Sequence, residues 1–333
     1  MKNSIIAGIA HYVPDRIVTN DDLAKVMDTS DEWIQERTGI KTRRFFDPEK
    51  DTTSNMGTRA ALKAIEKANM VPGDIDFIIF STLSPDYYFP GCGVLVQEQL
   101  GIKEVGALDV RNQCSGFIYG LSVADQFIKT GMYKTILVIG SEVHSSGLEM
   151  STKGRDVSVI FGDGAGAAVL TASDEPGKGV LSTHLHSQGK YAEELTVKSP
   201  GSCGKVRLTV DMVKEGRDIY PYMNGNFVFK NAIIRFQEVI MEALNANGYN
   251  IDDIDLLIPH QANLRITEFI QKQMGLSDEK VVSNIQHYGN TTAASIPIAL
   301  SESCERGLIK NGDLICLAAF GSGFTWASAL IRW

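Results

Sequence analysis

An internal repeat is the feature that most constrains the fold of this chain. The segment DIDFIIFSTLS, residues 74–84, returns as DIDLLIPHQAN at residues 253–263. Each copy follows a stretch with apolar residues at three-to-four spacing, and each precedes a second helical stretch, VQEQLGI from Val96 and IQKQMGL from Ile270. Later segments also match: TILVIGSE with DLICLAAFGSG, and FGDGAGAAVL with FGSGFTWASAL. A repeat over most of the chain predicts two similar halves.

Strand and helix patterns alternate within each half, and this alternation predicts a layered α/β fold. Strands that alternate with helices indicate mostly parallel sheets covered by helices. Two such units packed together give a five-layered α-β-α-β-α body. We place the halves at residues 1–172 and 173–333, with an insertion at about residues 141–160 that the second half lacks. This polar insertion is expected at a rim of the sheets, and ligands of such folds bind beyond the carboxyl ends of the strands.

Composition excludes several classes of function. The net charge of -8 argues against general binding to nucleic acid or anionic membranes, because such binding needs a basic surface. No apolar segment approaches the ~18 residues of a membrane helix, and the N-terminus is poorly suited to be a signal peptide. The 5 cysteines are widely spaced and include no Cys-x-x-Cys pair. We therefore expect a cytoplasmic protein without a structural metal.

Candidate catalytic residues stand where predicted strands end. Cys114 lies between a strand and a helix, and the free N–H groups and positive end of a helix start lower a thiol pKa. Asn290 stands at the equivalent turn of the second copy, and His260 follows that copy's first strand. Each has an ordinary structural alternative: a small buried cysteine, a turn asparagine and a capping histidine. Their occurrence at related strand ends favours one shared crevice.

The chain resembles, over nearly its full length, the thiolase-fold condensing enzymes of the β-ketoacyl-acyl-carrier-protein synthase III family. The motifs that carry the resemblance are SDEWIQERTGI, CSGF, FGDGAGAAVL, MNGNFVFK, IPHQAN, HYGNTTAASIP and FGSGFTW. The resemblance implies an acyltransferase that initiates type II fatty-acid synthesis. Cys114 would take the acyl group of an acyl-CoA such as acetyl-CoA, and malonyl-acyl carrier protein would lose carbon dioxide and attack it, giving a 3-oxoacyl-acyl carrier protein. Acyl-CoA is then a substrate, and no cofactor is implied.

The resemblance also implies how charge is stabilised. His260, through a ring N–H, and Asn290, through its amide, would stabilise the enolate of the malonyl thioester. The backbone N–H groups of Cys114 and Ser322 would form the oxyanion hole for the acyl group. Coenzyme A would be bound by a set of aromatic, basic and amide residues: Trp33, Arg37, Arg155, Asn226, Phe229 and Asn263.

The resemblance further implies two protein partners. Lys230 and Arg265 would form a small basic face for the acidic carrier protein; the alternative for both is ordinary solvated charge. Phe89 would reach into the acyl pocket of a second subunit, which makes the expected protein a homodimer.

Departures from the family leave alternatives open. Arg111, Asn112 and Gln113 precede the nucleophile where relatives carry small residues, and the segment 192–222 is longer than its counterpart. The length and branching of the primer therefore stay open, and a related condensing enzyme of secondary metabolism or of long-chain ketone or hydrocarbon formation is an alternative.

Two alternatives from other classes are less favoured. Cys-His-Asn is also the set of papain-like hydrolases, in which the histidine is an ion-paired base. A noncatalytic binding protein is disfavoured because all three reactive side chains are present. The segment GDGAGAA lacks the Gly-x-Gly-x-x-Gly spacing, so we reject a dinucleotide site there.

Overall fold

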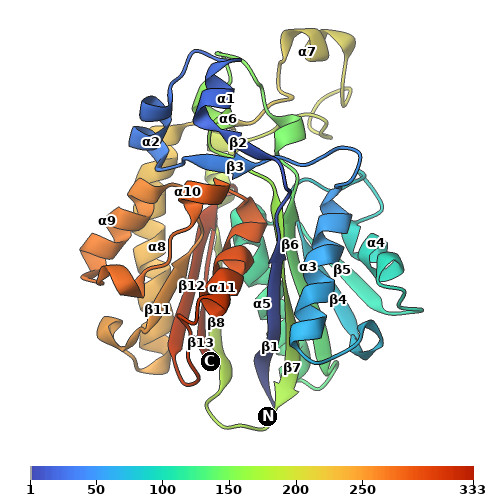
Figure 1. The fold of residues 1–333 in the computed structure, drawn as a ribbon, viewed down its shortest axis with the longest axis vertical. Coiled ribbons are helices and arrows are strands. Elements are labelled where there is room, and N and C mark those ends of the chain that lie inside the picture. The colour runs from blue at the N-terminus through green and yellow to red at the C-terminus, as the bar shows by residue number, and fades with distance from the viewer. Residues whose placement is uncertain (1) are drawn as a thin grey trace.

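The computed structural model describes residues 2–333, and two large sheets form its centre (Figure 1). The first sheet has the order β1-β7-β6-β4-β5, and the second has the order β11-β12-β13-β8. The strands of the first sheet are β1 (Asn3–Tyr12), β7 (Gly164–Ser173), β6 (Thr135–Glu142), β4 (Phe77–Ser81) and β5 (Gly106–Val110). Those of the second are β11 (Leu256–Pro259), β12 (Leu314–Gly321), β13 (Thr325–Arg332) and β8 (Gly179–Ser187).

Helices cover both outer faces of the sheets and fill the space between them. Between the sheets lie α5 (Gly116–Lys129) and α11 (Ser295–Glu305). The outer face of the first sheet carries α3 (Thr53–Lys67) and α4 (Cys92–Gln99), and that of the second carries α8 (Gly225–Asn247) and α9 (Leu264–Met274). The resulting order of layers is α-β-α-β-α, so the predicted five-layered fold is confirmed.

The largest core cluster joins the two halves. Phe117 and Leu121 of α5 pack with Ile296 of α11 and with residues from both sheets, such as Ile79 and Leu317. These side chains are nearly inaccessible to solvent, and their burial supplies the main driving force for joining the sheets. Because the central strands have helices on both faces, they need apolar residues at successive positions, as the fully buried sequence TILVIGSE of β6 illustrates.

The sheets are mixed, and the expectation that they are mostly parallel is wrong. Parallel pairs are β4–β5, β4–β6 and β11–β12, whereas β6–β7, β1–β7, β12–β13 and β13–β8 are antiparallel. The reason is clearest at β12 and β13, which only residues 322–324 connect. So short a connection reverses the chain and cannot make the crossover that parallel neighbours require.

The repeat is visible in the strand order. β1, β7, β6 and β4 occupy the places in the first sheet that β8, β13, β12 and β11 occupy in the second. The counterpart of β5 is reduced to a single parallel bridge between Leu257 and Val281. The chain crosses between the sheets after β7, which ends at Ser173; the division into residues 1–172 and 173–333 stays a prediction.

Short elements surround the carboxyl ends of β6, β11 and β12. The insertion after β6 contains α6 (Arg155–Ser158) and lies at the rim, beside α1 (Asn20–Ala24), α2 (Asp31–Thr38) and the β2–β3 pair (Ile17–Thr19 and Thr42–Arg44). Within residues 192–222, α7 (Val210–Glu215) stands out from the body, and β9 (Leu195–Thr196) pairs with β10 (Tyr222–Met223).

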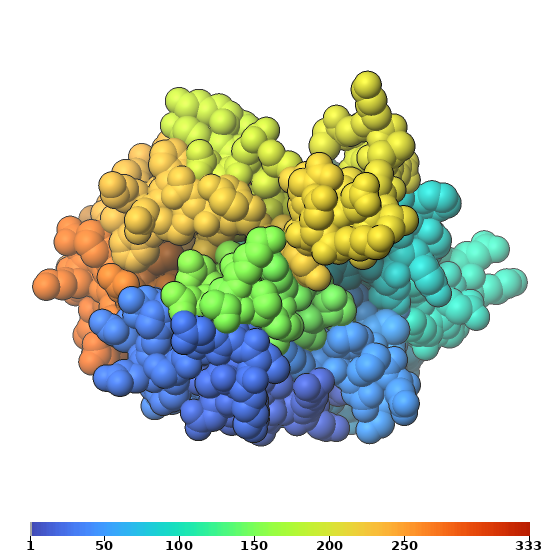
Figure 2. Space-filling view, turned by 90° about the horizontal axis from the view of Figure 1, so that it is seen from above, coloured from blue at the N-terminus to red at the C-terminus, as the bar shows by residue number. Residues whose placement is uncertain are grey.

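Figure 2, seen from above, shows the insertion in green between the N-terminal segment in blue and the residues around α7 in yellow. No helix among residues 2–333 is long and apolar enough to cross a membrane.

Candidate active site

Cys114 lies in a tight turn that joins β5 to α5. The turn is a short 3-10 helix, Gln113–Ser115, and it directly precedes Gly116, the first residue of α5. Gln113 has a φ of 43°, a left-handed conformation that is uncommon outside glycine and that turns the chain sharply before the nucleophile. The Cys114 side chain is buried, as a site for thioester chemistry requires.

The acidity of the Cys114 thiol differs from the sequence expectation. Burial raises the pKa of this thiol to about 12, and the nearby Glu142 carboxylate acts in the same direction. The backbone N–H groups of Ser322 and Cys114 itself lower the pKa, but by less. The expectation that the helix start favours a thiolate in the free enzyme is therefore wrong, because the cost of burying the charge exceeds the stabilisation that the N–H groups provide.

The end of β12 closes over the sulfur. A Cβ atom built on Gly321 would lie 2.5 Å from Cys114 Cβ and 2.7 Å from Sγ, so only glycine permits this approach. The next residue, Ser322, directs its backbone N–H at the thiol, as its effect on the Cys114 pKa shows. The two N–H groups that the family resemblance assigns to an oxyanion hole thus both face the sulfur.

His260 follows β11 and is buried with one ring nitrogen fixed. Its Nδ1 lies 2.6 Å from Ser295 Oγ, whereas Nε2 has no hydrogen-bond partner among residues 2–333. Burial, helped by nearby His144, lowers the pKa of His260 to about 3, so the ring is neutral at physiological pH. A neutral ring without a carboxylate partner is not the ion-paired base of a cysteine hydrolase.

Asn290 precedes a 3-10 turn, Thr292–Ala294, that leads into α11. Its Oδ1 accepts a hydrogen bond of 2.9 Å from the backbone N–H of Thr292, so the amide group, with its two N–H donors, points the other way. The backbone of Asn290 is held on the rim insertion, with its N–H donating to Ile160 O at 2.9 Å and its C=O accepting from Gly162 N at 3.1 Å.

The three candidate residues come from neighbouring turns. The turn of Cys114 contacts both β12 and the turn that follows Asn290. At this contact, a Cβ atom built on Gly116 would lie 3.6 Å from Ala293 Cβ. Ser295, the partner of the His260 ring, begins α11 directly after the second turn. Both halves of the repeat therefore contribute to one buried region.

Two buried residues of this region escaped sequence analysis. Glu142 ends β6 and accepts hydrogen bonds from Thr82 Oγ1 at 3.0 Å and Ser84 Oγ at 2.5 Å; burial raises its pKa to about 7. His144 lies two residues further, and burial lowers its pKa to about 3. The one signal in the sequence was an acidic residue at the end of an otherwise apolar strand.

The residues predicted to bind coenzyme A cluster in part. The guanidinium carbons of Arg37 and Arg155 lie 4.4 and 5.1 Å from the ring centre of Trp33. Trp33 and Arg37 both belong to α2, and the indole ring contacts both guanidinium groups. Asn263 Nδ2 donates to the backbone oxygen of Arg37 at 2.9 Å and so joins this group. Four of the predicted residues therefore lie together at the rim.

The other residues predicted to contact coenzyme A or the carrier protein lie in the first turns of α8 and α9, and Phe89 lies between β4 and α4. Arg265 stacks over Phe229, with its guanidinium carbon 5.9 Å from the ring centre, and Lys230 is exposed nearby on α8. Asn226 is also exposed, and no hydrogen bond within residues 2–333 joins its side chain to the Trp33 group. Phe89 is 78% exposed and is therefore available to a second molecule.

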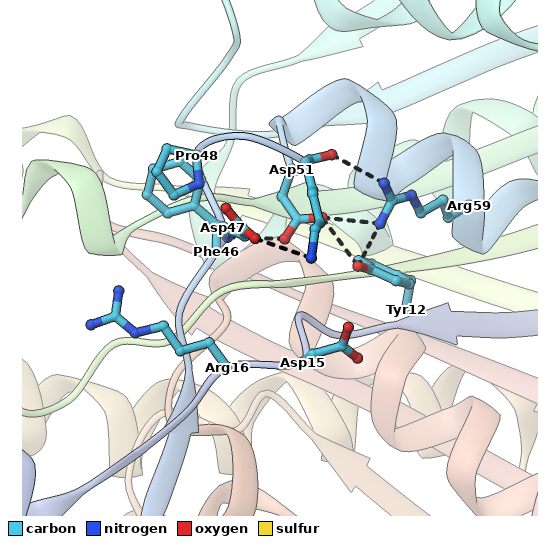
Figure 3. A pocket seen from close by; sticks show the side chains of 9 residues that line it. Tyr12, Asp15, Arg16, Phe46, Asp47, Pro48, Asp51 and Arg59 are labelled. Atoms are coloured by element: carbon cyan, nitrogen blue, oxygen red, sulfur yellow. Dashed lines mark hydrogen bonds and ion pairs between the residues drawn. The ribbon is translucent and has the colours of Figure 1, made fainter.

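A pocket of about 380 Å³ lies apart from this region, beside β1 and α3 (Figure 3). Arg59 donates there to Tyr12 Oη at 2.6 Å and to Asp51 Oδ1 at 3.0 Å, and Lys50 pairs with Asp47. None of the predicted site residues lines it. We do not regard it as the active site, because Cys114, His260 and Asn290 all lie elsewhere. Within residues 2–333, no group of three or more histidine, cysteine or acidic side chains is arranged to hold a metal ion.

A duplicated five-layered α/β fold with a buried thiol at its strand ends defines a thiolase-fold enzyme. Family models described as 3-oxoacyl-[acyl-carrier-protein] synthase III and its C-terminal part match residues 108–189 and 244–333. A β-ketoacyl-[acyl-carrier-protein] synthase III of Caldanaerobacter subterraneus is 45% identical over 98% of this chain and 97% of that protein. The Escherichia coli K12 protein of the same name is also 45% identical, over 98% of both chains.

A solved structure agrees with the sequence comparisons. The crystal structure of 3-oxoacyl-[acyl-carrier-protein] synthase III from Aquifex aeolicus is 42% identical and superposes with a TM-score of 0.91, covering 99% of this chain and 100% of that one. This chain belongs to the β-ketoacyl-acyl-carrier-protein synthase III family.

Proposed function

We propose that this chain is an acyltransferase that condenses an acyl-CoA primer with malonyl-acyl carrier protein and so initiates type II fatty-acid synthesis. Family membership supports the reaction class. The observation that carries the assignment of residues is the neutral, buried His260 with a free Nε2 next to the turns of Cys114 and Asn290. A donor of this kind suits an enolate oxygen and does not suit hydrolysis.

The first half-reaction transfers the acyl group to Cys114. The sulfur attacks the thioester carbonyl, the carbon–sulfur bond to coenzyme A breaks, and the thiol proton ends on the departing coenzyme A. The backbone N–H groups of Cys114 and Ser322 stabilise the oxyanion that forms on the way. Because burial raises the pKa of the resting thiol, the thiol is protonated in the free enzyme and loses its proton only as the new carbon–sulfur bond forms.

The second half-reaction uses the two side-chain donors. The malonyl group loses carbon dioxide, and the electron pair of the broken carbon–carbon bond forms an enolate. Nε2–H of His260 and the Asn290 amide stabilise the enolate oxygen, and its carbon attacks the acyl group and releases the Cys114 thiolate. The backbone N–H of Gln261 donates to Ser295 Oγ at 3.4 Å. The Ser295 hydroxyl can then donate its own proton to Nδ1 of His260, so that the ring proton of His260 is on Nε2.

Substrate and partner contacts complete the proposal. The adenine of coenzyme A stacks on Trp33 with Arg37 and Arg155 at the phosphates, while Asn226, Phe229 and Asn263 line the pantetheine path. Lys230 and Arg265 face the acidic carrier protein. The protein is a cytoplasmic homodimer in which Phe89 closes the partner's acyl pocket. The exposure of Phe89 and of the edge strand β5 supports the dimer.

One experiment tests the function and its main alternative. The protein is incubated with acyl-CoAs of different length and branching, and the acyl group on Cys114 is identified by mass spectrometry. Malonyl-acyl carrier protein, or a second acyl-CoA, is then added to the acylated enzyme. Formation of a 3-oxoacyl-acyl carrier protein supports the proposal. Reaction only with the second acyl-CoA would assign the chain to the condensing enzymes of other pathways, and release of free acid alone would make it a hydrolase.

A further inference from the structure

His144 is a buried imidazole for which the proposed reaction has no use. It follows β6 at the start of the rim insertion, and its backbone N–H donates to Asp163 Oδ1 at 2.7 Å. Its ring packs on Phe161, with 4.6 Å between ring centres and an interplanar angle of 31°. Backbone and ring are thus both fixed, although buried imidazoles usually need a polar partner to offset their desolvation.

The polar partner of His144 is Thr292. Nε2 of His144 lies 2.6 Å from Thr292 Oγ1, a short distance for a hydrogen bond to a ring nitrogen. Thr292 has a φ of 48°, in the left-handed region that β-branched residues rarely occupy. A strained residue of this kind persists only where its surroundings hold it, and the fixed His144 ring supplies a specific contact that does so.

The strained residue in turn orients a side chain of the candidate active site. The backbone N–H of Thr292 donates to Asn290 Oδ1 at 2.9 Å. This hydrogen bond fixes the orientation of the carboxamide and therefore the direction in which its two N–H donors point. A continuous path therefore runs from His144 Nε2 through the Thr292 side chain and backbone to Asn290. His144 also helps to lower the pKa of His260, the other side-chain donor of the candidate site.

We propose that His144 is a positioning residue that, through Thr292, holds the Asn290 carboxamide with its N–H donors toward the malonyl thioester. The assignment rests on the proposed function, since it gives Asn290 its part in the condensation. His144 itself touches neither substrate nor the reacting atoms. Loss of its ring nitrogen frees Thr292 to relax and Asn290 to rotate, so the condensation half-reaction suffers while acylation of Cys114 does not.

The test compares the two half-reactions in matched variants. His144→Leu replaces the imidazole with an apolar side chain that has no ring nitrogens, and Thr292→Val keeps the branched shape but removes the hydroxyl. Both are expected to acylate Cys114 at the wild-type rate and to consume malonyl-acyl carrier protein roughly tenfold more slowly, a partial loss of one oxyanion donor. Thr292→Ser keeps the hydroxyl and is expected to keep the wild-type condensation rate.

A double-mutant cycle separates positioning from general destabilisation. In an Asn290→Ala background, His144→Leu should cause no further loss of condensation, because the group that it positions is absent. His11→Leu is the matched control: its Nδ1 lies 2.9 Å from Ser301 Oγ, outside the candidate site, and its loss should leave both half-reactions unchanged. A normal condensation rate in His144→Leu, or an equal loss in both backgrounds, would overturn the inference.

A structural measurement keeps this test separate from that of the function. A crystal structure of His144→Leu is expected to show the Asn290 carboxamide rotated and Thr292 moved, whereas the His11→Leu structure should show neither change. If the wild-type enzyme does not condense malonyl-acyl carrier protein, the proposed function fails. The inference is then decided by the crystal structures alone, and an unmoved Asn290 would refute it.

Discussion

Nδ1 of His260 lies 2.6 Å from the hydroxyl of Ser295, and this contact fixes which ring nitrogen faces the candidate site. We expect Ser295→Ala to lower the condensation rate about tenfold, because the free imidazole can then place its proton on either nitrogen. Acylation of Cys114 should be unaffected. Rates of the two half-reactions give the measurement, and Ser301→Ala, which removes a hydroxyl next to His11, is the control that should leave both rates unchanged.

Cys114→Ala should abolish formation of the acyl-enzyme, since the variant lacks the sulfur that is proposed to carry the acyl group. The measurement is the intact mass of the protein after incubation with acyl-CoA. Cys203 is exposed on the segment before α7, so it is the cysteine most open to unspecific acylation. Cys203→Ala should acylate normally; if instead this variant lost the acyl group and Cys114→Ala retained it, the nucleophile would be misassigned.

Acid should destabilise the protein through His260. Its pKa is about 3 in the folded chain and near 6.5 when unfolded, so below pH 6.5 the unfolded chain takes up a proton that the folded chain does not. The free energy of unfolding therefore falls as pH decreases from 6.5 toward 3, by about 2 kcal/mol for this residue between pH 7 and pH 5.

The measurement for this prediction is urea unfolding at pH 7 and pH 5. His260→Gln should lose less stability between the two pH values than the wild type. His287→Gln removes an exposed ring that is hydrated in both states and should behave like the wild type. An identical pH dependence in His260→Gln and the wild type would show that folding does not change the pKa of His260.

Trp33→Ala should raise the KM for acyl-CoA about tenfold, because a base stacked on an aromatic ring is lost. The turnover number should change little, since Trp33 lies at the rim and not at the sulfur. A primer attached to pantetheine without the nucleotide provides the control, and its KM should be the same for variant and wild type. An equal effect on both substrates would assign Trp33 to packing between Arg37 and Arg155 rather than to nucleotide binding.

Sequence reasoning succeeded where the repeat supplied a comparison. The matching strands located the two sheets and placed Cys114 and Asn290 at equivalent turns, which the structure brings into contact. It failed on strand direction, because an apolar pattern reports burial but not the sense in which neighbouring strands run. It also failed on the thiol pKa, because the cost of desolvation depends on how completely other segments cover Cys114.

Glu142 and His144 were missed for a related reason. Their partners Thr82 and Thr292 are distant in the chain, and His144 lies in the insertion, for which the second half offers no counterpart. A polar residue next to a buried strand is uninformative until its hydrogen-bond partner is known. Contacts of this kind need coordinates.

The approach of Gly321 to Cys114 also bears on how the halves of the chain can diverge. Any larger residue at position 321 fills the space of the sulfur, so the choice of nucleophile in one half restricts a position in the other. Descendants of a duplicated gene usually drift apart freely. Here the copies cannot diverge independently, because position 321 of the second half must stay small to leave room for Cys114 of the first.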